Sequence, residues 1–275
     1  MDPVVVIGGG IIGTSVAYEL ASREIPVVLY EKNSLGSGST AKSMAIFFWH
    51  QDDPSPLEHR LRERAWDTYG PLIDDGTIEY TQIGTLDLAR GAAEVEAVQS
   101  VGERLADFGV ETDWLEAPAL AEHGLDPAAY DGGLFVPADG YLDPAEIIQH
   151  FVGEATDRGA TIETGVEVTD VGVADGSVTS VDTTEGRQEA SAVVNAAGPW
   201  APEINAMVGV DLPLRQTRGP IIVLQQDEPF SLPFMVLDDQ LYFREESRRQ
   251  AFGGHFVTEY EDGEAIDPDA NHSVA

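Results

Sequence analysis

Three glycines near the start of the chain have the spacing of a nucleotide-binding turn. Gly8, Gly10 and Gly13 form the pattern Gly-x-Gly-x-x-Gly, with Ile12 before the last of them. Glycines at this spacing permit a tight turn, a close approach of the backbone to a pyrophosphate, and close contact between a helix and a strand. Further along, the Glu31 carboxylate can accept hydrogen bonds from a ribose diol and would repel a 2′-phosphate. These residues predict a dinucleotide site that disfavours an NADP-type ligand.

The predicted elements around the glycines supply the context that such a site needs. A β-branched run, Val4–Ile7, precedes the turn, a helical stretch follows it to Leu20, and a second apolar strand, Val27–Glu31, ends in the acid. The amino end of the helix would point N–H groups and the positive end of its dipole at the phosphates. A glycine-rich turn can be purely conformational, but this full context favours nucleotide binding. The fingerprint alone does not separate FAD from NAD.

The charge of the chain excludes nucleic acid as a partner. The 275 residues include 15 Lys and Arg against 49 Asp and Glu, a net charge of −34, and the only lysines are Lys32 and Lys42. Such a field would repel a polyphosphate backbone, and it destabilises the compact state unless salt screens it. The carboxylates are spread over the whole chain, as in halophilic proteins of an acidic proteome. We therefore predict that the protein loses structure as salt is removed.

Other kinds of site are excluded by what the sequence lacks. Without cysteine there is no redox dithiol, thiolate metal site or cysteine-linked flavin, and the six histidines show no metal-ligand spacing, so no metal is expected. No segment approaches the run of about 20 apolar residues that a membrane helix needs. The amino terminus also has no basic region of a signal peptide. We expect a cytoplasmic protein with no membrane span.

The order of the predicted elements indicates two discontinuous domains. Apolar spacing predicts helices over 56–73, 92–108 and 144–158. Alternating residues on either side of Asp175-Gly176 predict an antiparallel meander. The buried strand Ala192–Asn195 then leads into small residues, which are typical of a ligand-facing carboxyl edge of a parallel sheet, although an ordinary strand-to-helix turn would look the same. The nucleotide-binding domain is predicted over 1–50 and 144–210, and a second domain over 51–143 and 211–275.

Four segments together resemble the D-amino-acid oxidase superfamily of FAD-dependent oxidoreductases, which includes sarcosine and glycine oxidases. They are the glycine fingerprint, Gly36–Thr40, Asp131–Pro144 and Asn195–Trp200, the last with the sequence Asn-Ala-Ala-Gly-Pro-Trp. The resemblance covers almost the whole chain and implies FAD as the cofactor. It implies an α/β fold with a Rossmann-like FAD-binding domain that carries the β-meander, plus a second, mixed-sheet α+β substrate domain.

The resemblance also implies roles for individual residues. The glycines and the following helix would hold the pyrophosphate, Glu31 the adenosine ribose, and Ser39-Thr40 the phosphate or ribityl side. Val168 is the residue whose backbone would meet the adenine, although an alternating valine in a meander is usually a core residue. The predicted cofactor-binding set is Gly8, Gly10, Ile12, Gly13, Glu31, Lys32, Ser39, Thr40, Val168, Ala197 and Gly198.

Members of the family pass a hydride from a carbon that bears an amine, or in some branches a hydroxyl, to the flavin. The protein must position the C–H bond, keep the amine deprotonated and neutralise any carboxylate. Tyr242 and Arg244 lie two apart on a predicted strand, hence on one face, in a segment similar to the family's substrate-clamping strand. An arginine there can equally be solvated or salt-bridged. His255, and less clearly His50, could accept the amine proton or orient substrate, but a lone histidine is usually structural.

The implied function is transfer of a hydride from the α-carbon of a small amino acid or secondary amine to FAD, with O2 or another acceptor reoxidising the flavin. Alternatives are a hydroxy-acid or glycerol-phosphate dehydrogenase of the same superfamily, and an inactive, truncated nucleotide-binding fragment. The segment Ala41-Lys42-Ser43 carries neither the arginine nor the flavin-linking histidine of several branches, which predicts non-covalent FAD. Family members continue with a glycine-rich segment, so we expect the substrate domain to be incomplete at the C-terminus.

Overall fold

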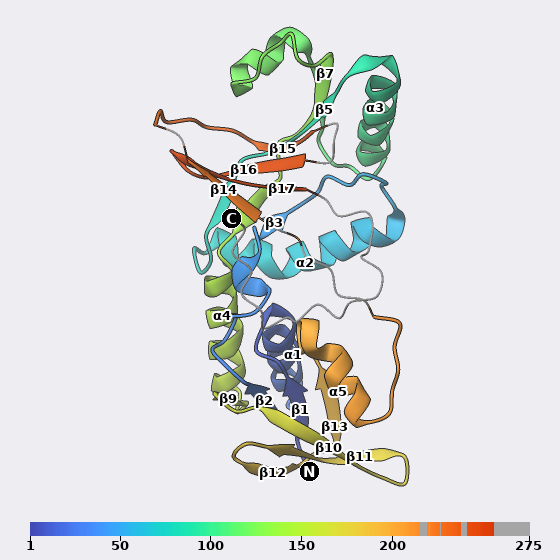
Figure 1. The fold of residues 1–275 in the computed structure, drawn as a ribbon, viewed down its shortest axis with the longest axis vertical. Helices are drawn as coiled ribbons and strands as arrows, with labels where there is room; N and C mark the ends of the chain where they lie inside the picture. Colours follow the sequence, from blue (N-terminus) through green and yellow to red (C-terminus); the bar gives the residue numbers. More distant parts are fainter. Residues whose placement is uncertain (215–218, 220, 226, 238–240, 256–275) are drawn as a thin grey trace. The chain divides into compact units, whose positions relative to one another are not determined.

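The computed structural model describes residues 1–214, 219, 221–225, 227–237 and 241–255. The chain forms two compact units, which Figure 1 draws as ribbons. Unit 1 comprises Met1–Ser43 and the segment that begins at Asp143 and includes the meander and the helix that follows it. Unit 2 comprises Met44–Leu142 and the strands near the end of the described chain.

Unit 1 is built on a parallel sheet with the strand order β13-β1-β2-β9. Its strands are β1 (Val4–Ile7), β2 (Val27–Glu31), β9 (Thr161–Thr164) and β13 (Ala192–Asn195). Its helices are α1 (Ile11–Ser22), α4 (Pro144–Asp157), α5 (Ala201–Met207), η1 (Thr40–Lys42) and η3 (Gly198–Trp200). The carboxyl ends of β1, β2 and β13 therefore meet at one edge of the sheet, where ligands of such sheets bind.

Alternation along β1 divides the core of unit 1 into two layers. Val6 packs with α1 and α4 residues on one face of the sheet, including Ala17 and Ala155. Val5 and Ile7 face the other way and pack against the meander and α5. The meander comprises β10 (Val168–Ala174), β11 (Ser177–Thr183) and β12 (Gly186–Glu189), paired antiparallel in that order. Each fully buried valine stabilises the unit by about 1.5 to 3 kcal/mol.

Unit 2 contains a seven-stranded mixed sheet with the order β14-β17-β16-β15-β5-β7-β6 and a small sheet with the order β3-β8-β4. The strands of the mixed sheet are β5 (Thr85–Ala89), β6 (Asp113–Glu116), β7 (Gly132–Val136), β14 (Ile221–Gln225), β15 (Phe234–Val236), β16 (Leu241–Ser247) and β17 (Gln250–His255). The small sheet has β3 (Ile46–Phe47), β4 (Tyr80–Gln82) and β8 (Gly140–Leu142). The helices are α2 (Pro56–Asp74), α3 (Gly91–Asp107) and η2 (Ala117–His123).

Side-chain caps and prolines mark the starts of two predicted helices. The Ser55 hydroxyl accepts a hydrogen bond from the Glu58 N–H ahead of α2, and the Asp143 carboxylate accepts one from the Ala145 N–H ahead of α4. In both helices a proline stands at the first turn, where its missing N–H leaves no bond unmade. The parallel sheet, the meander and the mixed sheet confirm the predicted α/β fold class. The predicted second domain runs on over 256–275, which lie outside the described residues.

Candidate functional site

A cavity of about 530 Å³ opens in unit 1 at the carboxyl edge of the parallel sheet. It lies beside the ends of β1, β2 and β13 and the start of α1. Of the predicted cofactor-binding residues, all but Gly13 line it: Gly8, Gly10, Ile12, Glu31, Lys32, Ser39, Thr40, Val168, Ala197 and Gly198. The fold thus brings together side chains from five separate stretches of sequence.

The glycines form a cradle that a side chain would fill. Gly8 has a φ of +109°, and a Cβ built on it would overlap the Ala196 carbonyl oxygen. A Cβ on Gly13 would overlap the Gly8 carbonyl oxygen in the same way, so Gly13 acts from behind the cavity wall. Gly10 precedes α1 and provides no side-chain cap for it. The backbone can therefore approach a pyrophosphate closely at the positive end of the helix dipole.

Two polar side chains hold the segments around this cradle in place. Glu31 accepts hydrogen bonds from the Gly9 N–H at 2.7 Å and from the Asn33 N–H at 2.8 Å, one on each carboxylate oxygen. The Thr40 hydroxyl accepts one from the Ile11 N–H at 3.2 Å, which ties η1 to the first turn of α1. Because a carboxylate oxygen has two acceptor positions, Glu31 keeps capacity for a ribose hydroxyl.

Asn195 organises the turn at the other side of the cavity, a role that the sequence did not reveal. Its carbonyl oxygen accepts from the Ala197 N–H, while its amide nitrogen donates to the Ala201 carbonyl and to Asn205. The strand end thereby presents Ala197 and Gly198 to the cavity. Val168 lines the cavity and is also 6% exposed in the core of unit 1, so both expected roles are compatible with its position. These features fit an adenine dinucleotide.

In unit 2 the register of the sheet places Tyr242 and Arg244 on one face of β16, as predicted. Tyr242 lies opposite Gly254 of β17, and its ring covers that glycine. His255 lies opposite Leu241, hence on the other face of the sheet, and it is exposed. The structure therefore brings Tyr242 and Arg244 together and does not bring His255 to them.

Arg244 is a buried cation with hydrogen-bonding capacity to spare. It is 4% exposed, its guanidinium lies 4.0 Å from the centre of the Tyr141 ring, and one nitrogen pairs with Glu246. Its Nε and Nη1 atoms are buried without a hydrogen-bond partner. Burial lowers the pKa of Arg244, while Glu246 opposes that shift, and an arginine stays charged in a protein. Unpaired donors on a buried cation are costly, which favours an acceptor such as a ligand carboxylate.

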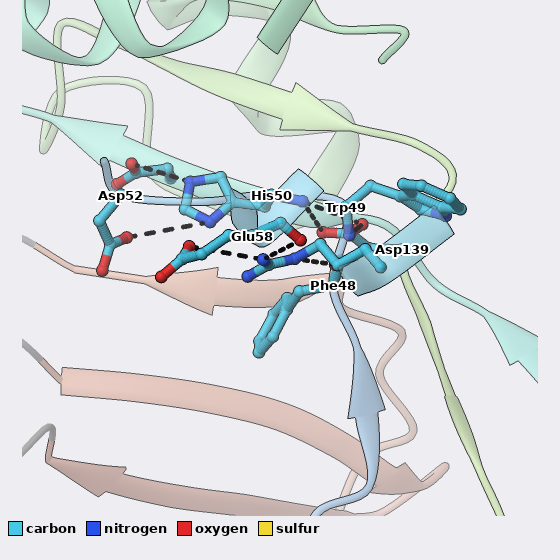
Figure 2. A network of polar contacts seen from close by, with 8 residues as sticks. Phe48, Trp49, His50, Asp52, Glu58 and Asp139 are labelled. Atoms are coloured by element: carbon cyan, nitrogen blue, oxygen red, sulfur yellow. Dashed lines mark hydrogen bonds and ion pairs between the residues drawn. The ribbon is translucent and has the colours of Figure 1, made fainter. Parts of the chain in front are cut away.

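A second hollow, of about 430 Å³, lies within unit 2 and is surrounded by charged side chains. The His50 ring lies close to two carboxylates: its Nε2 lies 3.4 Å from the Asp87 carboxylate and its Nδ1 lies 3.9 Å from that of Asp52, which Figure 2 labels beside it. The buried Asp139 carboxylate accepts from the Trp49 N–H at 2.6 Å and holds the same loop from behind. The hollow is lined by Phe48, His50, Gln51, Asp52, Asp53, Glu58, Arg62 and Val236.

The carboxylates around His50 favour the protonated form of its imidazole. Burial alone lowers the pKa of His50, but the hydrogen bond to Asp87 and the charges of Asp87, Asp139 and Asp52 outweigh burial and raise it. Burial raises the pKa of Asp139, which the N–H groups of Trp49 and His50 partly offset. The protonated form has no lone pair that could accept a proton, so these surroundings make His50 less suited to act as a base for an amine.

Searches of the described residues for a metal cluster and for a membrane-spanning helix found neither. Among those residues no three histidine, cysteine or acidic side chains are grouped so that they could hold a metal ion. The helices described there include none that is both long and apolar enough to cross a membrane.

Comparisons with known proteins show the family to which the chain belongs. A family model described as DAO, FAD dependent oxidoreductase, matches residues 3–274. A glycine oxidase from Geobacillus kaustophilus is 28% identical over 82% of this chain and 62% of its own length. An anaerobic glycerol-3-phosphate dehydrogenase subunit A1 from Haloferax volcanii is 31% identical over 80% of this chain and 40% of its own length. The crystal structure of L-proline dehydrogenase from P. horikoshii superposes with a TM-score of 0.81 at 26% identity, over 93% of this chain and 70% of that one.

The matches confirm the resemblance and FAD as the cofactor. The chain spans between about a quarter and about three fifths of the length of curated relatives that it matches.

Proposed function

We propose that this chain, which belongs to the DAO family of FAD-dependent oxidoreductases, takes part in removing a hydride from the α-carbon of a small amino acid or secondary amine. FAD, when bound, accepts the hydride at its N5 position. Unit 1 would hold the dinucleotide, without a covalent link, and unit 2 would supply substrate contacts. O2 or another acceptor would then take up the electrons.

The observation that carries the substrate class is the buried guanidinium of Arg244. Its Nε and Nη1 donors have no partner and can each donate to a ligand carboxylate, and Tyr242 stands on the same face of the strand. Nearby, the Tyr242 ring packs in an apolar cluster with Phe234, Val236 and Phe48, which suits the carbon part of a small substrate. Arginine would neutralise the carboxylate while apolar walls exclude water and keep the amine deprotonated. This assigns the roles of clamp to Arg244 and wall to Tyr242.

The test begins with the cofactor. Purified chain with a flavin absorption spectrum supports binding, and anaerobic bleaching by glycine, sarcosine or proline supports the proposed reaction. Arg244→Lys should raise KM for these carboxylates at least tenfold and leave the flavin spectrum unchanged, since one ammonium group cannot replace the donors spread over the guanidinium. Arg187→Gln, an exposed arginine of β12, is the matched control and should change nothing. Equal KM values for wild type and Arg244→Lys would refute the clamp.

The Haloferax volcanii relative supports a second candidate, oxidation of a hydroxyl-bearing substrate such as glycerol 3-phosphate. Bleaching by glycerol 3-phosphate or a 2-hydroxy acid, with no response to amines, would favour it. Protein that cannot be loaded with FAD would favour an inactive fragment and exclude both reactions for this chain.

A further inference from the structure

Both lysines of the chain line the same cavity. The sequence has only Lys32 and Lys42, and its other basic residues are arginines. Lys32 follows β2 and Lys42 ends η1, and both contribute to the lining of the unit 1 cavity. The chain has a net charge of −34, and both of its lysine side chains lie at the cavity in which the proposed dinucleotide would place its phosphates.

We propose that Lys32 and Lys42 are a pair of cofactor-binding residues that counter the negative field of this protein and attract the phosphates of the dinucleotide. The inference rests on the proposed function, in which this cavity holds FAD. It adds Lys42 to the binding residues. It also assigns the pair a role, which is to reduce the electrostatic repulsion between the cavity and a dianion.

The charges along the cavity wall support this task. Beside the two lysines the lining carries Glu31, Glu167 and Glu203, so its formal charge is −1. Without the lysines it would be −3, in a chain that already repels anions at long range. The helix N-terminus supplies only about half a unit of positive charge, so the lysines are the larger source.

Lys32 is held in position by its neighbours. Its Nζ lies 4.1 Å from the centre of the Trp200 ring, on the turn that follows β13. Such a cation–π contact is worth about 0.5 to 1 kcal/mol at a partly exposed site. The adjacent Glu31 carboxylate is engaged by the N–H groups of Gly9 and Asn33. Lys32 and Trp200 therefore meet across two loops that both border the cavity.

Lys42 lies at the end of η1, which is hydrogen-bonded to the start of α1, where the pyrophosphate would bind. Its N–H donates to the Ser39 carbonyl at 3.1 Å, which closes η1. The Thr40 hydroxyl two residues earlier accepts from Ile11 at the start of α1. Lys42 is exposed. Its flexible side chain can therefore stay hydrated when no ligand is bound and extend to a ligand when one binds.

The experiment titrates the full chain, freed of cofactor, with FAD, ADP and adenosine at about 0.1 M and 1 M KCl, where the screening lengths are about 10 Å and 3 Å. At low salt Lys32→Gln and Lys42→Gln should each weaken FAD and ADP binding about threefold to tenfold. Adenosine, which has no phosphate, should bind within about twofold of wild type. Lysine-to-arginine variants should retain affinity, and Arg187→Gln, a charge removed from an exposed strand of the same unit, is the control.

The outcomes separate this inference from the proposed function. If wild type binds FAD and ADP but both lysine-to-glutamine variants bind them equally well, the inference is overturned and the proposed function stands. An equal loss of adenosine affinity would overturn it too, because the lysines would then act on the nucleoside or on the fold. If wild type binds neither FAD nor ADP, both fall. Melting temperatures within about 2 °C of wild type exclude unfolding as the cause.

Discussion

The cavity of unit 1 and the hollow of unit 2 are lined by different kinds of residue. Around the cavity, glycines keep space clear beside the start of α1, and the rest of the lining includes lysine and glutamate side chains. Around the hollow it offers paired side-chain charges, with His50 between Asp87 and Asp52 and with Arg62 against Glu58. The cavity depends on glycines, whose lack of a side chain leaves space for a ligand. The hollow depends on the pairing of its charged side chains.

This difference determines which substitutions should disrupt each site. A backbone cradle cannot adjust to an added Cβ, because the atoms it meets belong to the fixed chain. A cluster of paired charges tolerates changes of size better than the loss of one partner, which leaves the other charge unsatisfied, most severely where that charge is buried. The predictions below run from the largest expected effect to the smallest.

Gly13→Ala should be the most damaging small change in unit 1. Its Cβ would overlap the Gly8 carbonyl oxygen, so the turn and helix must separate. We expect a loss of about 3 kcal/mol in the free energy of unfolding and about a hundredfold in FAD affinity. Gly153→Ala in α4 is the control, since a Cβ there meets nothing within 4 Å and should leave stability equal or higher. Equal effects at the two glycines would contradict the backbone cradle.

Asp139→Ala should have the largest effect in unit 2. The buried carboxylate accepts from the Trp49 and His50 N–H groups, and both donors would be left without it. We expect denaturant unfolding to show a loss of about 2 to 3 kcal/mol. Asp113→Ala on exposed β6 should cost less than about 0.5 kcal/mol. Similar losses for both would mean that Asp139 is not the anchor of the His50 loop.

The two sites also differ in how far the sequence predicted them. The positions of Gly8, Gly10 and Glu31 at the cavity were predicted, because these residues lie within one strand-turn-helix-strand unit whose spacing fixes their geometry, while their role in binding stays a prediction. The pairing of His50 with Asp87 and the role of Asp139 were not predicted, since these residues come from different strands and loops. No local pattern specifies which acid a histidine meets. The role of Asn195 was missed for a related reason: its partners are the backbone of Ala197 and Ala201 and the side chain of Asn205, which no local pattern specifies.

The raised pKa of His50 predicts how the stability of unit 2 depends on pH. Because the folded-state pKa lies above the unfolded value of about 6.5, the stabilisation is complete below that pH and is lost as pH rises through the folded-state pKa. Unfolding free energies should fall over that window, by up to about 1.4 kcal/mol per pH unit. His50→Gln should abolish the slope, and Asp87→Asn should move it to lower pH. An unchanged slope in His50→Gln would assign it to another group.

The smallest effect is expected at the edge of the hollow, where Arg104 pairs with Asp53 at 2.6 Å. Their side chains are 43% and 92% exposed, so water competes for both charges. A double-mutant cycle of Arg104→Gln and Asp53→Asn should give a coupling below about 1 kcal/mol that shrinks as salt is added. A coupling above about 2 kcal/mol would mean that rim and buried charges act as one network, and the hollow would then be as intolerant of change as the glycine cradle.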